Sequence, residues 1–393
     1  MELSVKGTSN RRHDQATGSS PFVPGQGQVP PYLAGRDAEQ ALIRELFSEL
    51  EKRRAPGSDL ILYGPRGNGK TALLEWARRE ARSRKIRTLK FSSKEIQSTE
   101  WLAKRLSILS PWLRALTELS AWGVRIKTSD PRPGQISDMM ARRARRHGLV
   151  FAIDEAHTLA VDLGQQILHA IQRLRSEEVP VMLLLAGTPE LPRHLSSMDA
   201  SFWDRSRILP LGLLEPTAAG DAIRIPLEAG GRSIAADALA RVVRESHGYP
   251  FFLQLLGELL WQGIADPTRP ASLDDVDRAL PRFEHRTNIY YRNRHAELDK
   301  ADLDFVAARL AAPFADADKL TDLEVDETIG LALEREGRGS DRQAVRAARD
   351  RLHDLGYIWS SEGEARPYFR PGIPSLMQYM ARSRDIDVGS VPQ

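Results

Sequence analysis

Short apolar segments alternate with amphipathic stretches along the first half of the chain. Apolar runs at 60–63, 86–91, 149–153 and 181–186 each have the length of one buried strand, and between them apolar residues recur at helical spacing. Strands without a polar face, separated by helices, are typical of a parallel sheet covered on both sides. The pattern therefore predicts an α/β core with βαβ connections. The expected helices span 36–53, 70–83, about 94–122, 136–146 and 160–175.

The second half of the chain is predicted to be mainly helical. After Pro210 helices are expected near 216–225, 235–246, 250–263 and 273–294. Helices near 300–311 and 340–355 precede two short strands, 357–361 and 366–370, and a last helix from Pro374. Helices followed by a β-hairpin resemble a winged helix. The expected organisation is a disordered tail 1–31, an α/β core 32–213, a helical lid 214–296, a winged-helix domain 297–385 and a tail 386–393.

Composition narrows the function classes. The chain has 393 residues, 41% of them hydrophobic and 28% charged, which is typical of an ordinary globular protein of two or three domains. The longest strongly apolar run, 181–186, is far shorter than a membrane-spanning helix requires. The absence of cysteine excludes disulfides, cysteine-ligated zinc and thiol nucleophiles. With no apolar leader in the first twenty residues, these observations predict a cytoplasmic protein.

A phosphate-binding motif follows the first apolar strand. Residues 64–71 read GPRGNGKT and fit the pattern G-x-x-x-x-G-K-[ST], with a helix opening at Lys70. Its glycines let backbone N–H groups converge on phosphate oxygens, Lys70 is expected to reach the β and γ phosphates, and Thr71 to bind Mg²⁺. A glycine-rich turn without a ligand is the alternative. The predicted nucleotide-binding residues are Gly64, Pro65, Arg66, Gly67, Asn68, Gly69, Lys70, Thr71, Ala72, Asp154 and Pro250.

Two further strands end in polar residues that complete such a site. The strand 149–153 delivers Asp154 and Glu155, which we expect to hold Mg²⁺ and to activate the attacking water as general base. The alternative is an acidic strand end that caps the next helix. The strand 181–186 ends at Gly187 and Thr188, whose hydroxyl would touch the γ-phosphate or the water. Carboxyl ends of parallel strands share one edge, which is where open α/β sheets bind ligands.

Together these segments resemble the AAA+ superfamily of ATPases. The resemblance rests on the P-loop, on 153–157 (IDEAH) and on 186–191 (AGTPEL), and within the superfamily it is nearest to Orc/Cdc6 and STAND ATPases, including transposition helpers of the TniB/TnsC kind. It implies ATP and Mg²⁺ as cofactors, a sensor role for Thr188, and packing of residues 32–36 near the adenine. The implied fold is a parallel-sheet P-loop core with an all-helical lid and a C-terminal winged helix.

The resemblance also points to residues outside these motifs. AAA+ proteins commonly use an arginine from a neighbouring subunit, and Arg205 is the first choice for it and Arg207 the second, although both could instead pair with surface carboxylates. The helix from about 250 contains no sensor 2 arginine. Instead Gly248, Tyr249 and Pro250 resemble the GxP motif of STAND ATPases, whose lid closes over the nucleotide; an ordinary proline helix start is the alternative.

Charge is distributed unevenly. Residues 71–150 hold 18 Lys and Arg against 7 Asp and Glu, whereas residues 296–393 hold 13 basic against 19 acidic residues. Nonspecific DNA binding through 71–150 is therefore one interpretation, and solvated helix faces are the other. On the predicted helix 340–355, Arg342, Arg346 and Arg349 share one face, but the acidic surplus favours a protein-binding winged helix over one that reads bases.

Two functions remain open from the sequence. The first is an ATP-binding, slowly hydrolysing switch ATPase, an expected homo-oligomer whose nucleotide state controls its assembly and the binding of a protein partner. The second is a DNA-bound helper ATPase for transposition, replication initiation or defence, which grips duplex through its basic core. Salt-dependent DNA binding distinguishes the two.

Overall fold

A five-stranded parallel sheet forms the centre of the computed structural model, which describes residues 19–25, 27, 29–108, 135–264, 266–360 and 368–384. The strand order is β2-β3-β4-β1-β5. The strands are β1 Leu60–Tyr63, β2 Arg87–Ser92, β3 Leu149–Asp154, β4 Val181–Gly187 and β5 Arg207–Pro210. The predicted α/β parallel-sheet core is confirmed, and β5 adds a strand that the apolar pattern did not reveal.

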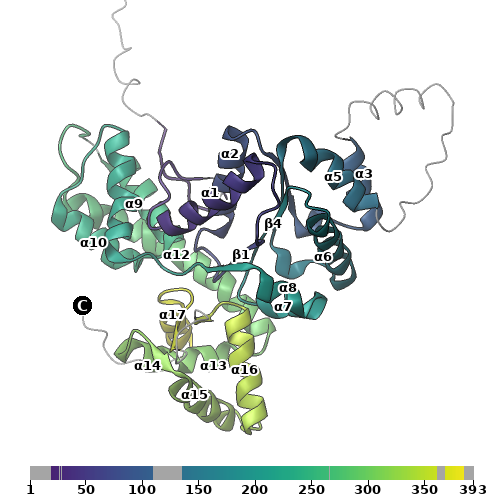
Figure 1. Ribbon diagram of the computed structural model, residues 1–393. Helices are drawn as coiled ribbons and strands as arrows, with labels where there is room; N and C mark the ends of the chain where they lie inside the picture. The colour runs from purple at the N-terminus through teal and green to yellow at the C-terminus, as the bar shows by residue number, and fades with distance from the viewer. Residues whose placement is uncertain are drawn as a thin grey trace, which may run out of the picture.

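Helices cover both faces of this sheet (Figure 1). Leu60 and Leu62 point toward α1 and α2, while Ile61 and Tyr63 point toward the helices on the other face. Every residue of β4 is buried, as expected for a strand enclosed on both sides. The helices of this part are α1 Asp37–Glu51, α2 Lys70–Ser83, α3 Thr99–Ile108, α5 Gln135–His147, α6 Val161–Ser176, α7 Leu191–Met198 and α8 Ala200–Arg205, with short 3₁₀ turns η1 Ser93–Glu95 and η2 Ala156–Thr158.

The sheet register brings three loops to one edge. Tyr63 of β1 lies beside Gly187 of β4, and Ile153 of β3 lies beside Leu185 of the same strand. The segments that follow β1, β3 and β4 are therefore neighbours, although up to 124 residues separate Gly64 from Thr188 in the sequence. This edge is the carboxyl end of the sheet, where the sequence predicted the nucleotide.

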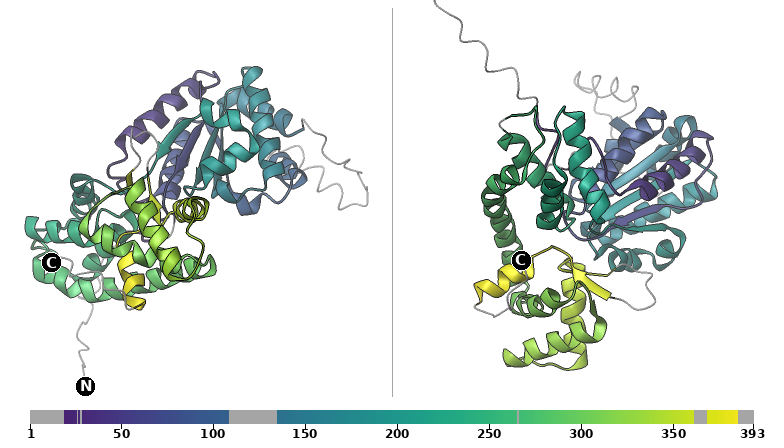
Figure 2. Two further views of the ribbon diagram at one scale, coloured as in Figure 1. Left: turned by 90° about the horizontal axis from the view of Figure 1, so that it is seen from below. Right: turned by 90° about the vertical axis from the view of Figure 1, so that its left-hand side faces the viewer.

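Helices alone follow the sheet, and a small antiparallel sheet comes near the end of the chain (Figure 2). The first helices are α9 Pro216–Ala229, α10 Ala236–Ser246, α11 Pro250–Gly263 and the long α12 Leu273–Lys300. The C-terminal region comprises α13 Asp304–Arg309, α14 Ala311–Asp316, β6 Leu320–Thr321, α15 Asp322–Arg335, α16 Arg342–Asp354, β7 Ile358–Trp359, β8 Tyr368–Pro371 and α17 Leu376–Ser383. Its strand order is β6-β8-β7. The helical lid and the winged helix are confirmed as fold elements, with α15 and β6 in addition.

Some sequence predictions concern residues outside the described part. Residues 109–134, the tail 386–393 and the first 18 residues belong to these, so the helix expected over 94–122 is described only as far as Ile108. Where the chain is described, no helix is both long and apolar enough to cross a membrane.

Candidate nucleotide site

The P-loop connects β1 to α2 and adopts backbone conformations that require glycine. Gly67 has φ +79°, and a Cβ there would lie 2.1 Å from the Tyr249 hydroxyl. Gly69, with φ +86°, is the N-cap of α2, and a Cβ there would meet nothing within 4 Å. No acidic residue occupies the first turn of α2. Open space above a helix N-terminus with its positive potential is a suitable cradle for phosphate.

Lys70 is buried at the bottom of this loop. Its ammonium donates to the backbone oxygens of Gly64 at 2.8 Å and Pro65 at 2.7 Å. Burial lowers the pKa of Lys70 to about 8, an effect that the nearby carboxylates of Glu155 and Asp154 oppose. The two carbonyls are weak partners for a buried cation, so an anion placed above the loop would compete for the ammonium.

Asp154 and Glu155 lie at the end of β3, as the sequence predicted. The Asp154 Oδ1 accepts from the Glu155 N–H at 3.0 Å, and its Oδ2 lies 4.0 Å from the ammonium of Lys90. Glu155 has φ +55°, a left-handed conformation that is uncommon outside glycine. Its side chain is 43% exposed, which leaves the carboxylate accessible to a substrate or a water.

His157 connects the ends of β3 and β4, a link that sequence reasoning missed. Its Nδ1 accepts from the Thr188 N–H at 3.3 Å, and its Nε2 lies 3.5 Å from the Glu155 Oε2. Burial lowers the pKa of His157 to about 4, so the ring is neutral at pH 7. Because Nδ1 accepts, the single proton lies on Nε2 and faces Glu155. The Thr188 hydroxyl is buried and has no hydrogen-bond partner among the described residues.

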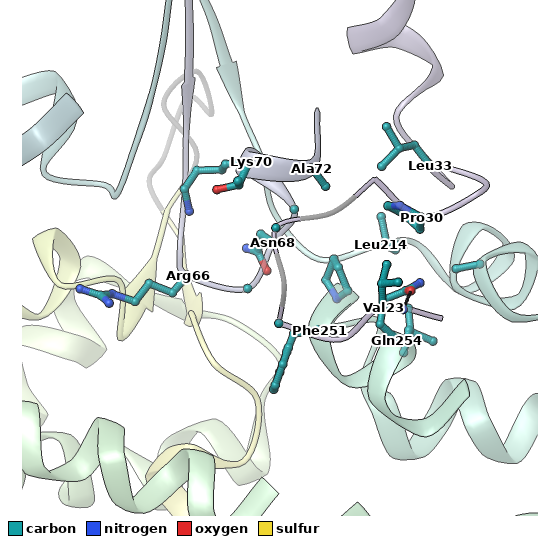
Figure 3. Close-up of a pocket in the computed structure, with 18 of the residues that line it drawn as sticks. Val23, Pro30, Leu33, Arg66, Asn68, Lys70, Ala72, Leu214, Phe251 and Gln254 are labelled. Carbon is teal, nitrogen blue, oxygen red and sulfur yellow. Dashed lines mark hydrogen bonds between the residues drawn. The ribbon is translucent and has the colours of Figure 1, made fainter. Parts of the chain in front are cut away.

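A cavity of about 380 Å³ opens above the P-loop (Figure 3). Lys70 and Glu155 line one part of it, and Leu33, Pro250 and Phe251 line the apolar part. The predicted residues Arg66, Gly67, Asn68, Gly69, Thr71 and Ala72 also line it, as do Tyr32, Ala34 and Arg36 from the segment expected near the adenine. Polar groups at one end and apolar groups at the other suit a nucleotide.

The chain before Tyr32 also contributes to this cavity. The expectation of a disordered tail through residue 31 is wrong for the part described, because Phe22 is only 2% exposed and packs against Gly257 of α11. The Val23 N–H donates to the Gln254 side-chain oxygen at 3.1 Å. Gly27 approaches the methyl group of Thr71. Composition alone predicted disorder, since one buried phenylalanine does not change a Pro/Gly-rich average.

The lid contacts the P-loop through Tyr249. Its fully buried hydroxyl donates to the Arg66 backbone oxygen at 2.6 Å and lies 3.0 Å from the Tyr290 hydroxyl of α12. Burial holds the pKa of Tyr249 well above its ordinary value, so the hydroxyl stays protonated. Gly248 has φ +66°, and its carbonyl oxygen accepts a hydrogen bond from the Leu214 N–H at 2.8 Å. The Gly-Tyr-Pro segment therefore rests directly on the phosphate-binding loop.

The C-terminal region contacts the same loop from outside the cavity. A Cβ on Gly356 would lie 3.2 Å from the Pro65 Cα, and one on Gly372 would lie 3.3 Å from the Pro65 Cγ. Trp359 of β7 packs on Tyr63, with ring centroids 5.4 Å apart. In Figure 3 the Arg66 side chain points away from the cavity toward this hairpin. These contacts could not be foreseen from the sequence because they join segments about 290 residues apart.

Ion pairs extend this contact along α16. The Arg193 guanidinium on α7 lies 2.6 Å from the Asp354 carboxylate, and Arg351 lies 3.8 Å from Glu190. One side of α16, the helix on which Arg342, Arg346 and Arg349 were expected to share a face, is thus turned to the ATPase core. Arg349, one of the three arginines predicted to share a face of this helix, is paired with Asp326 of α15 at 2.9 Å.

Arg205 and Arg207 lie at the amino end of the parallel strands, whereas the P-loop of their own chain lies at the carboxyl end. Arg207 pairs in register with Leu60 at the start of β1, about 13 Å along the strand from the loop after Tyr63. The Arg205 guanidinium donates to Ser201 at 3.0 Å and lies 3.5 Å from Asp199, and its side chain is 52% exposed. Neither arginine lines the cavity above the P-loop of its own chain.

The basic residues of the ATPase core fall into two groups. Arg142, Arg145 and Arg146 of α5 are exposed and form no ion pair within the described part of the chain. Arg143, which was expected to act with them, is buried, and it donates to the backbone oxygens of Met139 and Leu106. It is therefore a structural residue. Arginines of α2 and of its C-terminal end are paired with carboxylates. Arg78 and Arg79 of the helix pair with Glu75, and Arg84, the residue after the helix, pairs with Glu51 and Glu80.

The residues present fit a nucleotide with a divalent cation. The cavity offers the buried ammonium of Lys70 and the N–H groups at the start of α2. The Thr188 hydroxyl, at the end of the neighbouring strand β4, has no hydrogen-bond partner among the described residues. No group of three or more His, Cys, Asp or Glu side chains that could bind a metal by itself occurs among the described residues. Mg²⁺ at nucleotide sites needs only one or two protein ligands beside the phosphates, so Thr71 and Asp154 suffice.

Comparison with known proteins agrees with the motifs. Residues 32–185 match the family model described as the AAA ATPase domain. The chain is similar in structure to the Walker-type ATPase of Pyrococcus abyssi, with 16% identity, a TM-score of 0.61 and coverage of 88% of this chain and 96% of that one. It is also similar to the ORC2 protein of Aeropyrum pernix, with 14% identity, a TM-score of 0.55 and coverage of 92% and 97%. No curated protein sequence matches the chain.

At these identities the structural similarity concerns the fold. It extends beyond the ATPase core to the helical and C-terminal regions, because nearly the whole of each chain is covered. The order of a parallel sheet, a helical region and a winged helix, which the sequence predicted, is thus shared with these two structures.

Proposed function

We propose that the chain is a switch ATPase controlled by its nucleotide. The nucleotide state of the P-loop determines whether the C-terminal winged helix remains packed on the ATPase core. The observation that carries the proposal is the contact of Gly356 and Gly372 with Pro65. Pro65 belongs to the loop that would hold the phosphates, so a change in that loop acts directly on the hairpin. The related ORC2 structure of Aeropyrum pernix was determined as ADPNP and ADP complexes.

Lys70 supplies the coupling in this proposal. Its ammonium now donates to the carbonyls of Gly64 and Pro65. When nucleotide is bound, Lys70 would exchange these carbonyls for phosphate oxygens, which are stronger acceptors. The Pro65 peptide then loses a partner on the inside of the loop while the hairpin packs on its outside. Repacking of either side changes the fit of the other, because closely packed groups have little free space.

The other site residues have separate tasks. Thr71 and Asp154 would hold Mg²⁺, and bound ATP with Mg²⁺ would supply a phosphoanhydride polarised for hydrolysis. Glu155 would accept the proton of the attacking water, and neutral His157 would orient that carboxylate through its Nε2–H. The Thr188 hydroxyl would contact the water or the terminal phosphate. Arg205 would complete the site of a neighbouring subunit, since its own P-loop is out of reach.

A measurement of mass and nucleotide binding tests this function. The Glu155→Gln variant should bind ATP and turn it over slowly, and light scattering after size exclusion should then give a larger assembly with ATP than with ADP. Asp162→Asn, a substitution at an exposed position of α6, is the matched control and should hydrolyse ATP normally. If neither the wild type nor Glu155→Gln binds nucleotide, the proposed function is wrong.

A DNA-bound helper ATPase is the second candidate, and one observation favours it. The exposed arginines of α5 lie beside the start of β2, where the Arg87 N–H donates to the Gly148 oxygen at 3.2 Å, and Arg82, Lys85 and Arg87 are also exposed there. Such a cluster suits phosphate contacts without base specificity.

DNA binding of suitable variants separates the two candidates. Replacing Arg142, Arg145 and Arg146 by Gln should weaken binding to duplexes of any sequence and flatten its salt dependence, if DNA is bound by the core. Replacing Arg342 and Arg346 by Gln is the control and should matter less. Absence of measurable binding by the wild type at low salt would leave the protein-controlling switch as the function.

A further inference from the structure

One arginine near the cavity is not used by the site described above. Arg294 lies on α12, the long helix that runs from the lid to the C-terminal region, and it lines the nucleotide cavity together with Tyr290, one turn earlier. Its side chain is only 18% exposed. Its Nε is buried and has no hydrogen-bond partner among the described residues. A buried guanidinium with an unused donor is costly unless something occupies it.

The other cations around the cavity either have partners already or point away from it. Arg36 donates to the backbone oxygens of Asn68 and Gly212, and Lys70 donates to two P-loop carbonyls. The Arg66 side chain points away from the cavity (Figure 3). Among the described residues that line it, Arg294 is therefore the remaining cation. The helix α11, which also lines the cavity, contains no arginine.

Arg294 is held by partners that it can exchange. Its Nη1 lies 2.9 Å from the Glu297 carboxylate, three residues later on the same helix, and this carboxylate is 38% exposed. The guanidinium lies 5.5 Å from the centroid of the Tyr290 ring. A partly exposed ion pair within one helix is weak, so a buried phosphate would be a better partner.

Arg294 is also bonded to the winged helix. The Tyr357 hydroxyl donates to the Arg294 backbone oxygen at 2.7 Å and lies 3.5 Å from the Glu297 Oε2. Tyr357 immediately follows Gly356, which packs on Pro65, and precedes β7. One hydroxyl of the C-terminal region thus contacts the backbone of Arg294 and the carboxylate that pairs with its guanidinium.

We propose that Arg294 reads the terminal phosphate of the bound nucleotide in cis and reports it to the C-terminal hairpin through Tyr357. When the guanidinium leaves Glu297 for the phosphate, the carboxylate becomes an unpaired anion beside the Tyr357 hydroxyl. The Arg294 backbone oxygen and the Glu297 carboxylate then compete for that hydroxyl, and the packing of the β7 hairpin changes. This inference rests on the proposed nucleotide function and assigns the residue that distinguishes ATP from ADP.

Binding constants for ATP and ADP test the proposal. In Arg294→Ala, ATP affinity should fall about tenfold or more while ADP affinity changes less than about threefold, because only ATP carries the phosphate that is read. Arg294→Lys should recover part of the loss. Glu297→Gln should strengthen ATP binding, since the guanidinium is released. Arg292→Ala, an exposed arginine on the same helix, is the matched control and should leave both affinities unchanged.

The outcomes separate this inference from the proposed function. Equal losses for ATP and ADP in Arg294→Ala, or no loss for either, overturn the role of Arg294. In both cases Lys70→Ala still tests the P-loop, because it should weaken the binding of both ATP and ADP. If the wild type binds neither nucleotide, the proposed function fails and the role of Arg294 fails with it. Thermal unfolding of each variant verifies that the fold is retained.

Hydrogen exchange gives a second readout that does not depend on activity. The amides of Ile358 and Trp359 should exchange at different rates in the ATP and ADP states of the wild type. In Tyr357→Phe this difference should disappear while the preference for ATP over ADP is kept. Retention of the difference in Tyr357→Phe would contradict the relay through the hydroxyl.

Discussion

The indole of Trp359 lies edge-on against the ring of Tyr63, with centroids 5.4 Å apart and planes inclined by 65°. Tyr63 is the last residue of β1 and leads directly into the P-loop, whereas Trp359 belongs to the winged helix. The winged helix is therefore packed on the ATPase site of its own chain. We interpret this contact as the mechanical basis of the proposed switch.

Shortening Trp359 should release the hairpin from the core. Trp359 is 7% exposed and also stacks on His353, so Trp359→Ala should destabilise the fold by about 3–5 kcal/mol. We expect nucleotide to exchange faster in this variant, because the P-loop loses its outer support; stopped-flow displacement of a fluorescent ADP measures it. Leu323→Ala, at a 66% exposed leucine of α15, is the control. Equal exchange rates in both variants would separate the hairpin from nucleotide control.

Replacing Lys70 by Met should abolish nucleotide binding and yet stabilise the empty protein. Burial lowers the pKa of Lys70 to about 8 from an ordinary value of 10.5, so holding the charge in the folded state costs about 3 kcal/mol at pH 7. The unfolded state binds the proton more tightly, and the cost therefore disappears as pH rises from about 8 to 10.5. Denaturant unfolding should show Lys70→Met more stable at pH 7, with the difference shrinking by pH 10. A constant difference would contradict the burial of a charged lysine.

The contact of His157 with Thr188 and Glu155 predicts a defect in hydrolysis rather than in binding. His157→Leu removes both polar contacts, and turnover should fall about tenfold or more while ATP affinity stays within about threefold. Since burial lowers the pKa of His157 to about 4, the wild-type rate should show no break near pH 6.5 from this residue. A variant that loses ATP affinity as strongly as turnover would reduce His157 to a structural role.

The same pKa predicts how stability depends on acid. The unfolded state takes up a proton on His157 near pH 6.5 and the folded state only near pH 4, so the wild type loses stability as pH falls through this interval. His157→Leu should lose less stability between pH 6.5 and 4 than the wild type. An identical acid dependence of both proteins would contradict a neutral buried His157.

Arg205→Ala should lower hydrolysis without changing ATP affinity, because the arginine lies at the far edge of the sheet from its own P-loop. Mixing Arg205→Ala with Glu155→Gln subunits should restore part of the activity, since each variant leaves intact one side of a shared site. The mixture must be shown to assemble by light scattering. Without any recovery, the pairing of Arg205 with Asp199 and Ser201 is its role, and Arg207 becomes the next residue to test.

The sequence predicted the parallel sheet and its edge correctly because the information is local. Apolar runs define β1, β3 and β4, and the parallel arrangement alone requires Gly64, Asp154 and Thr188 to meet at one edge. By contrast, β5 has the residues Arg-Ile-Leu-Pro, which are too few and too polar to stand out as a buried strand. Its position depends on pairing with β1, which local sequence does not encode.

Contacts between segments that are far apart in the sequence could not be predicted from it either. By composition Phe22 belongs to a Pro/Gly-rich tail, and nothing in the local sequence indicates that its ring packs on Gly257 of α11. Arg143 shared a basic run with three exposed arginines, and helical periodicity was the one signal that could have separated it, since it lies on the buried face with Met140 and Ala144. The position of Tyr357 beside Arg294 depends on the packing of three regions and has no sequence signature.

The distance between the winged helix and the ATPase core tests the central claim most directly. Because the chain has no cysteine, single cysteines at the exposed positions Asp162 of α6 and Gln343 of α16 can carry spin labels without other changes. Pulsed electron–electron double resonance should give one narrow distance between the two labels in the nucleotide-free and ADP states. In the Glu155→Gln background with ATP, a second, shifted distance should appear. The same single distance in all three states, with ATP binding verified, would contradict the proposed switch.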